Sequence, residues 1–225
     1  MNVSIHQPDF FPYPGFFNKI FLSDIFVILD RTQFEFGITN RNKIITPEGT
    51  WTRISVPVKN GQKFFQINDV KINNDMNWKE KNLDLISKSY SKSKFFDLYN
   101  TSINSIFEEK WEYLIEINIK ILKTIFEWLD IKTKIIFESE LNVKGTSSEK
   151  LFNICKQIDA TKYVSGSGGK NYLDEKIFQK NHIDIEYQKY TPTLYSQLNS
   201  KSFIPNLSIL DLLFNMGYES RKFVL

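Results

Sequence analysis

Cysteine and histidine are scarce in this sequence. One cysteine, Cys155, and two histidines occur among 225 residues, which excludes an internal disulfide and leaves no CxxC or HExxH spacing for a metal. We therefore predict no metal among the site residues, although carboxylates could still hold a magnesium ion. Cys155 lies at helical spacing from Leu151 and Ile158, which favours a buried structural thiol over a nucleophile.

Long apolar runs and a large charge of one sign are also missing. No apolar stretch approaches the roughly 18 to 20 residues of a membrane span, and the N-terminus MNVSIHQPDF has neither the charged nor the apolar region of a secretory signal. Lys and Arg number 29 against 26 Asp and Glu, without a basic block of the kind that binds nucleic acid. We expect a cytoplasmic protein with no membrane span and no nucleic acid among its partners. A homodimer stays open.

Apolar residues are plentiful: 41% of the chain is hydrophobic, including 20 Phe, and these residues supply a large core. Their spacing predicts an α/β fold, with a mostly parallel or mixed sheet flanked by helices and a helical middle section. No long polar linker divides the chain, so we predict a single domain over 1–225 with a helical insertion around 78–130. We expect strands over residues 2–6, 24–30, 67–72, 132–137, 163–165 and 183–190, a hairpin over 42–58, and helices over 14–23, 147–158, 171–180 and from Ser208 onward.

The N-terminal strand leads into the first group of candidate site residues. His6, Gln7 and Asp9 place an imidazole, an amide and a carboxylate at the end of that strand, and prolines at 8, 12 and 14 impose an extended, rigid loop. Such a group can perform acid–base chemistry. The structural alternative is a histidine that caps the strand or bonds to a backbone carbonyl.

A second group follows the next apolar strand and comprises Asp30, Gln33, Asn40, Arg41 and Lys43. The guanidinium of Arg41 could hold a phosphate or a carboxylate through two hydrogen bonds, which would suit a phosphorylated ligand. An ion pair between Asp30 and Arg41, or a solvated loop, explains the same spacing equally well.

A third group lies in a glycine-rich loop. Ser165, Gly166, Gly168 and Gly169 precede an expected helix, whose free amide groups could bind an anion. The loop lacks the spacings of a P-loop and of a dinucleotide-binding turn, so a simple flexible loop is an equal alternative.

A fourth group lies near the C-terminus and comprises Tyr195, Gln197, Asp211 and Asn215. Ser208 is suited to cap the last helix, on which Asp211 and Asn215 lie four residues apart on one face. Polar groups on an otherwise apolar helix are costly if they are buried without partners. These two side chains could therefore bind either a ligand or a neighbouring loop.

Taken together, these motifs resemble those of the WbqC-like family over residues 3–217. The resemblance rests on the HQP element at 6–8, the GFF-K element at 15–19, the Asn-Arg pair at 40–41, the SG-GG-YL pattern at 165–173 and the SxxDLLFxxG ending at 208–217. Membership would imply a role in the synthesis of O-antigen, capsule or a related bacterial surface polysaccharide, in company with nucleotide-sugar enzymes. The shared motifs add Lys19 and Tyr172 to the predicted substrate-binding residues.

Our leading hypothesis is a transferase that adds an acyl or aminoacyl group to the amine of a nucleotide-linked sugar. His6 would be the general base, and Arg41 and the glycine-rich loop would hold phosphates. We expect no tightly bound cofactor, with acyl-CoA or another activated acyl donor as co-substrate. In the first alternative, glycosyl transfer, Asp9 or Asp30 would act as base or bind a metal.

Two other hypotheses stay open. Nucleotidyltransferases of the HIGH type also begin with a strand, a histidine-containing loop and a helix, but their second element is missing here, so this is an analogy of fold. A non-catalytic binding or scaffold protein for glycan assembly is the other class. We expect the HQP loop, the Asn40–Arg41 segment, the glycine-rich loop and the region 195–215 to converge on one cleft.

Overall fold

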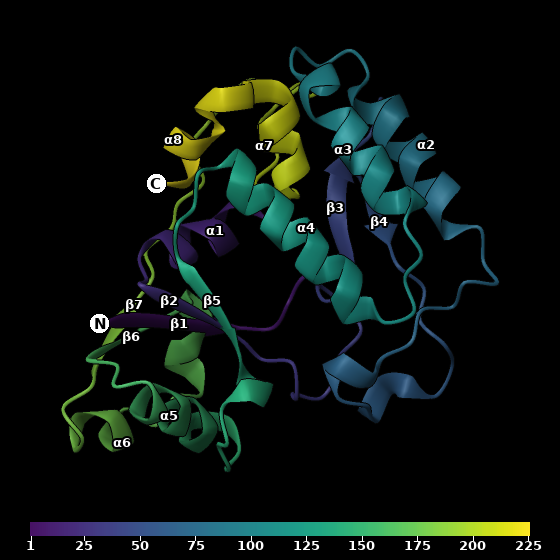
Figure 1. Ribbon diagram of the computed structural model, residues 1–225. Helices are drawn as coiled ribbons and strands as arrows, with labels where there is room; N and C mark the ends of the chain where they lie inside the picture. Colours follow the sequence, from purple (N-terminus) through teal and green to yellow (C-terminus); the bar gives the residue numbers. More distant parts are fainter.

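Five parallel strands form the central sheet of the computed structural model, which describes residues 1–225 (Figure 1). The strands are β1 (Asn2–His6), β2 (Ile25–Ile28), β5 (Lys134–Phe137), β6 (Lys162–Ser165) and β7 (Asp184–Tyr187). Their order is β5-β2-β1-β6-β7, and every neighbouring pair is parallel. The chain runs from β1 to β2 and β5 on one side and later to β6 and β7 on the other, so the strand order reverses beside β1. Parallel sheets bind ligands at the carboxyl ends of their strands at such a point.

Alternating strand residues pack into a separate core on each face of the sheet. On one face, Phe26 and Ile28 pack with α1 (Pro14–Phe21). On the other face, Val3, Ile5 and Val27 pack with α5 (Ser147–Gln157) and α6 (Glu175–Gln179). Figure 1 shows α1 above the sheet and α5 and α6 below it. Burial on both faces explains why β2 is apolar throughout.

A hairpin and the middle helices form the other half of the molecule (Figure 1). Strands β3 (Arg41–Ile45) and β4 (Trp51–Ser55) pair antiparallel in a two-stranded sheet. Helices α2 (Trp78–Tyr90) and α7 (Ile209–Met216) contact this hairpin, and α8 (Ser220–Val224) contacts α1. Helices α3 (Phe96–Glu108) and α4 (Leu114–Trp128) complete the middle section. None of the helices has the length and apolarity needed to cross a membrane.

The predicted α/β fold with a helical middle section is confirmed. Pro14 occupies the first turn of α1, and Ser208 caps α7 by accepting a hydrogen bond from the backbone N–H of Leu210 at 3.3 Å. Cys155 is fully buried, and burial raises the pKa of its thiol to about 12. One continuous core of 39 buried residues joins the upper face of the sheet to the hairpin and the middle helices.

Two predicted elements differ in the structure. Residues 67–72, predicted as a strand, form a 3-10 turn at Ile67–Asp69 followed by two isolated bridges, from Lys71 to Tyr113 and from Ile72 to Val58, because no strand runs alongside to complete a ladder. Of the helix predicted over 171–180, only α6 is formed. Asp174 caps it by accepting a hydrogen bond from the backbone N–H of Lys176, and a 3-10 turn at Ser167–Asn171 precedes it.

Candidate active site

Two cavities adjoin at the carboxyl end of β1. The first has a volume of about 600 Å³ and the second about 490 Å³, and His6 and Ile38 line both. Polar residues lining the first cavity include Gln7, Arg31, Gln33, Ser147, Lys150 and Tyr172. Polar residues lining the second include Asp9, Tyr13, Lys43, Ser167, Gln188 and Tyr190. His6 is therefore placed where two separate ligands could both reach it.

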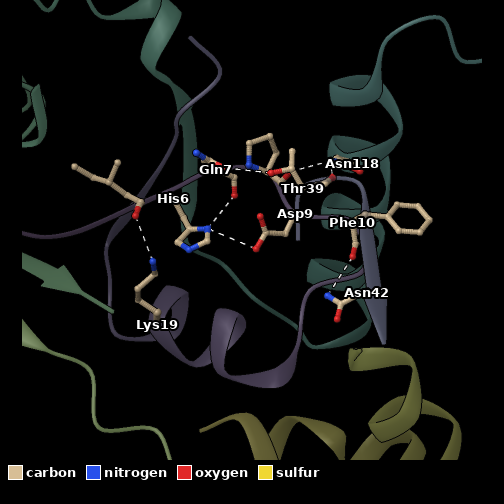
Figure 2. A network of polar contacts seen from close by, with 10 residues as sticks. His6, Gln7, Asp9, Phe10, Lys19, Thr39, Asn42 and Asn118 are labelled. Atoms are coloured by element: carbon tan, nitrogen blue, oxygen red, sulfur yellow. Dashed lines mark hydrogen bonds and ion pairs between the residues drawn. The ribbon is translucent and has the colours of Figure 1, made fainter. Parts of the chain in front are cut away.

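The imidazole of His6 is held in one tautomer. Its Nδ1 lies 3.0 Å from the carbonyl oxygen of Gln7 (Figure 2), and because that oxygen can only accept, Nδ1 carries the proton and donates it. Burial, and secondly the positive charge of Lys19, lower the pKa of His6 well below its ordinary value. The ring is thus neutral at neutral pH. Its Nε2 makes no hydrogen bond within the protein and is free to act as a base.

Asp9 and Lys19 are two buried ionisable groups beside this ring. One carboxylate oxygen of Asp9, Oδ2, lies 3.7 Å from Nδ1 of His6, and the other, Oδ1, is buried without a hydrogen-bond partner. Lys19, on α1, donates from Nζ to the carbonyl oxygen of Ile5 at 3.2 Å. Burial raises the pKa of Asp9 to about 7 and lowers that of Lys19 to about 7, and the attraction between the two charges opposes both shifts.

Hydrogen bonds from α4 and the hairpin fix the loop that carries these groups (Figure 2). Asn118, in α4, donates from Nδ2 to the carbonyl oxygens of Pro8 and Thr39, both at 2.8 Å. The hydroxyl of Thr39 donates to Oε1 of Gln7 at 3.1 Å, and Asn42 donates from Nδ2 to the carbonyl oxygen of Phe10 at 3.3 Å. Asn118 was not among the predicted site residues, although a lone asparagine on the apolar face of a helix was a usable signal.

The second predicted group is divided by the structure. Gln33 lines the first cavity and Lys43 the second, where the Lys43 ammonium lies 4.6 Å from the centre of the Trp51 ring. Arg41 is exposed at the start of β3 and lines neither cavity. Two members are buried and bound to backbone groups instead. Asp30 accepts from the N–H of Ser139 at 3.0 Å, and Asn40 donates to the carbonyl oxygen of Val56 at 3.0 Å.

The glycine-rich loop borders the second cavity through Ser167. Gly169 is required by close packing, because a Cβ there would lie 2.1 Å from Oγ of the fully buried Ser165. A Cβ at Gly166 or Gly168 would meet nothing within 4 Å. The proposed phosphate-binding role of these glycines is thus left as a prediction.

The fourth group forms a buried hydrogen-bond network away from both cavities. Asp211 is fully buried and accepts from the hydroxyls of Tyr90 at 3.0 Å and Tyr195 at 2.8 Å, and from Nε2 of Gln197 at 2.8 Å. Burial raises the pKa of Asp211, against the effect of these donors. Asn215 donates to the Asp211 carbonyl at 2.7 Å and accepts from a backbone N–H at 3.0 Å.

In place of the expected single cleft, the structure has two adjoining cavities, and fewer of the predicted residues line them than expected. Members of the first three groups line them, but Tyr195, Gln197, Asp211 and Asn215 do not, and the region 195–215 supplies only Asn206. No three His, Cys, Asp or Glu side chains are grouped as in a metal site. Polar lining residues that are not among the predicted site residues include Arg31, Ser147 and Lys150 in the first cavity and Tyr13 and Gln188 in the second.

Fold and site together define an α/β protein with a candidate ligand site at the strand-order reversal of a parallel sheet. The chain belongs to the WbqC-like protein family, whose sequence model matches residues 7–223. It is 32% identical over 228 residues to the uncharacterized protein Rv1507c of Mycobacterium tuberculosis, an alignment that covers 99% of this chain and 96% of the relative. No solved structure matches the chain significantly.

Proposed function

We propose that this protein is a cytoplasmic transferase of bacterial surface-polysaccharide synthesis, which adds an acyl or aminoacyl group to the amine of a nucleotide-linked sugar. One observation carries the proposal: a neutral imidazole with an unbonded Nε2 lies between two adjoining cavities. A base shared by two cavities suits a reaction between two bound substrates. The polysaccharide context is what membership of the WbqC-like family implies.

In the proposed reaction the sugar amine reacts in its neutral form, after the ammonium has lost one proton to solvent, and Nε2 of His6 removes a second proton as the nitrogen attacks the carbonyl carbon of an acyl thioester. A carbon–nitrogen bond forms, the carbon–sulfur bond breaks, and the proton passes from the imidazole to the departing thiolate. The Gln7 carbonyl oxygen, 3.0 Å from Nδ1, keeps the ring oriented, and by accepting this hydrogen bond it also favours the transient imidazolium.

The test is formation of a mass-shifted product by the purified protein. Wild type is incubated with UDP- and dTDP-linked amino sugars and acetyl-CoA or aminoacyl thioesters, and the products are analysed by mass spectrometry. The His6→Asn variant retains a donor for the Gln7 carbonyl but lacks Nε2, so its turnover should fall about 10²- to 10⁴-fold while sugar-nucleotide affinity changes little. Binding of the sugar nucleotide without any product from wild type would overturn the proposal.

Glycosyl transfer is the second candidate, favoured by the buried carboxyl of Asp9 in the wall of the second cavity. This reaction releases a nucleoside diphosphate instead of a thiol, so the same incubations distinguish the two. A strain carrying His6→Ala that still makes normal surface glycan would favour a non-catalytic binding role over either enzyme.

A further inference from the structure

The second cavity contains a carboxyl group that lacks a full set of partners. Asp9 is 4% exposed and lines this cavity, and its Oδ1 accepts no hydrogen bond from the protein. A buried carboxylate oxygen without a donor costs free energy. An ammonium group of a ligand bound in the cavity would pair with the accessible edge of this carboxyl and supply the opposite charge.

Two tyrosine rings from distant parts of the chain form an aromatic wall in the same cavity. The ring centres of Tyr13 and Tyr190 lie 6.4 Å apart with an interplanar angle of 68°, and neither hydroxyl makes a hydrogen bond within the protein. Aromatic faces beside a few fixed polar groups are typical of small-molecule sites, and they suit the C–H faces of a sugar ring.

Gly15 gives these rings the space they occupy. A Cβ at Gly15 would lie 2.4 Å from Cε2 of Tyr13 and 2.6 Å from Cδ1 of Tyr190. Glycine within a helix is less favourable than alanine by about 1 kcal/mol, so its presence in the first turn of α1 is explained by the aromatic wall.

Gln188 adds a fixed acceptor. Its Nε2 donates to the carbonyl oxygen of Gly15 and to Oδ1 of Asn18, both at 2.7 Å, which orients the amide and leaves Oε1 as an acceptor in the cavity wall. Carboxylate, amide and phenol oxygens thus outnumber cations here, and Lys43 is the one lysine or arginine among the lining residues. Such a site favours ligands rich in donors, such as an amine and hydroxyls.

We propose that the second cavity is the acceptor site and binds an amine-bearing sugar ring, with the amine on Asp9 and the ring against Tyr13 and Tyr190. His6 then lies beside the amine, and the first cavity, which shares His6, receives the other substrate. The reaction rests on the proposed function, whereas the binding site can be tested without it.

The experiment is a titration of the full chain, labelled with ¹³C in its tyrosine rings, with D-glucosamine, D-glucose and N-acetyl-D-glucosamine. The Tyr13 and Tyr190 signals, assigned from Tyr→Phe variants, should shift with glucosamine, and the two sugars without a free amine should bind at least about tenfold more weakly, as expected for loss of a charged hydrogen bond. Asp9→Asn should weaken glucosamine binding about tenfold or more and leave glucose binding unchanged. Equal responses to all three sugars, no shift of either tyrosine, or unchanged glucosamine affinity in Asp9→Asn would overturn the inference.

A second variant tests the aromatic wall without touching a charge. Gly15→Ala should displace the rings and weaken glucosamine binding, and Ser102→Ala, at an exposed helical position in α3, is the control that should leave binding unchanged. The experiments can also overturn the proposed acyl transfer and the proposed acceptor site independently of each other. Glucosamine binding at the tyrosines without acyl transfer contradicts only the proposed function, and acyl transfer without glucosamine at the tyrosines contradicts only the acceptor site.

Discussion

Burial acts on the three ionisable side chains at the end of β1 in different directions. It lowers the pKa of His6 and Lys19 and raises that of Asp9, because a low-dielectric environment penalises whichever form is charged. His6 is therefore neutral at neutral pH, whereas Asp9 and Lys19 both titrate near it. A charged substrate group entering the site therefore has a large effect on all three residues.

The Asp9→Asn variant tests whether the buried Asp9 carboxyl has a raised pKa, because such a group makes the free energy of unfolding depend on pH. Burial raises the pKa of Asp9 from 3.8 to about 7, so between these values the native protein holds a proton that the unfolded chain has released. Wild type should therefore lose stability as the pH rises from about 4 to about 7. The variant has no such proton, so its free energy of unfolding relative to wild type should increase with pH across this window.

The measurement is chemical unfolding of both proteins at several pH values. In wild type the effect of Lys19, a gain of stability with rising pH above about 7, lies on the other side of the window. In the variant the loss of the Asp9 charge lowers the pKa of Lys19 further, which changes the difference between the proteins in the same direction. A difference between the proteins that is constant with pH would show that Asp9 is not a buried, proton-retaining group.

At the scale of elements, sequence patterns correctly predicted the helices and strands that depend only on neighbouring residues in the chain. The apolar run of β2 and the proline that begins α1 identify those elements without any partner. The segment 67–72 has a strand-like composition, but a strand also needs a neighbour, and none runs beside it. The position of His6 at the end of a strand likewise indicated its place at the cavities. Asp30 and Asn40 instead bind backbone groups of distant segments, and no local sequence pattern reveals such contacts.

Asn118 is the residue through which α4 holds the candidate site. Replacing it with leucine leaves the buried carbonyl oxygens of Pro8 and Thr39 without their donor, at about 1–3 kcal/mol for each unsatisfied group. Asn118→Leu should lower the free energy of unfolding by about 2–6 kcal/mol and weaken glucosamine binding, because the loop bearing Asp9 is released. Urea unfolding and the tyrosine titration measure the two effects.

The matched control is Asn104→Leu in α3, a half-buried asparagine whose side chain makes no hydrogen bond. It should change stability by less than about 1 kcal/mol and leave binding intact. If Asn118→Leu behaved like this control, α4 would have no part in positioning the loop.

At the scale of the whole molecule, the site exists only where the two halves are packed together. The sheet contributes His6, the hairpin contributes Lys43, and the segment after β7 contributes Gln188 and Tyr190 before the chain returns to the hairpin as α7. The network around Asp211 secures that return. It joins α7 to α2 through Tyr90 and to the segment after β7 through Tyr195 and Gln197.

Asp211→Asn distinguishes a structural role for this network from the ligand-binding role predicted from the sequence. The amide has one acceptor oxygen in place of two, so at least one of the three donors should lose its partner, at about 1–3 kcal/mol for each buried donor left unpaired. Urea unfolding should show this loss, and Asp75→Asn, at an exposed position, should change stability by less than about 0.5 kcal/mol. Because Asp211 lines neither cavity, glucosamine should bind the folded variant with wild-type affinity. Unchanged stability together with lost binding would instead place Asp211 among the ligand-binding residues, and the network would then have to open toward the cavities when substrate enters.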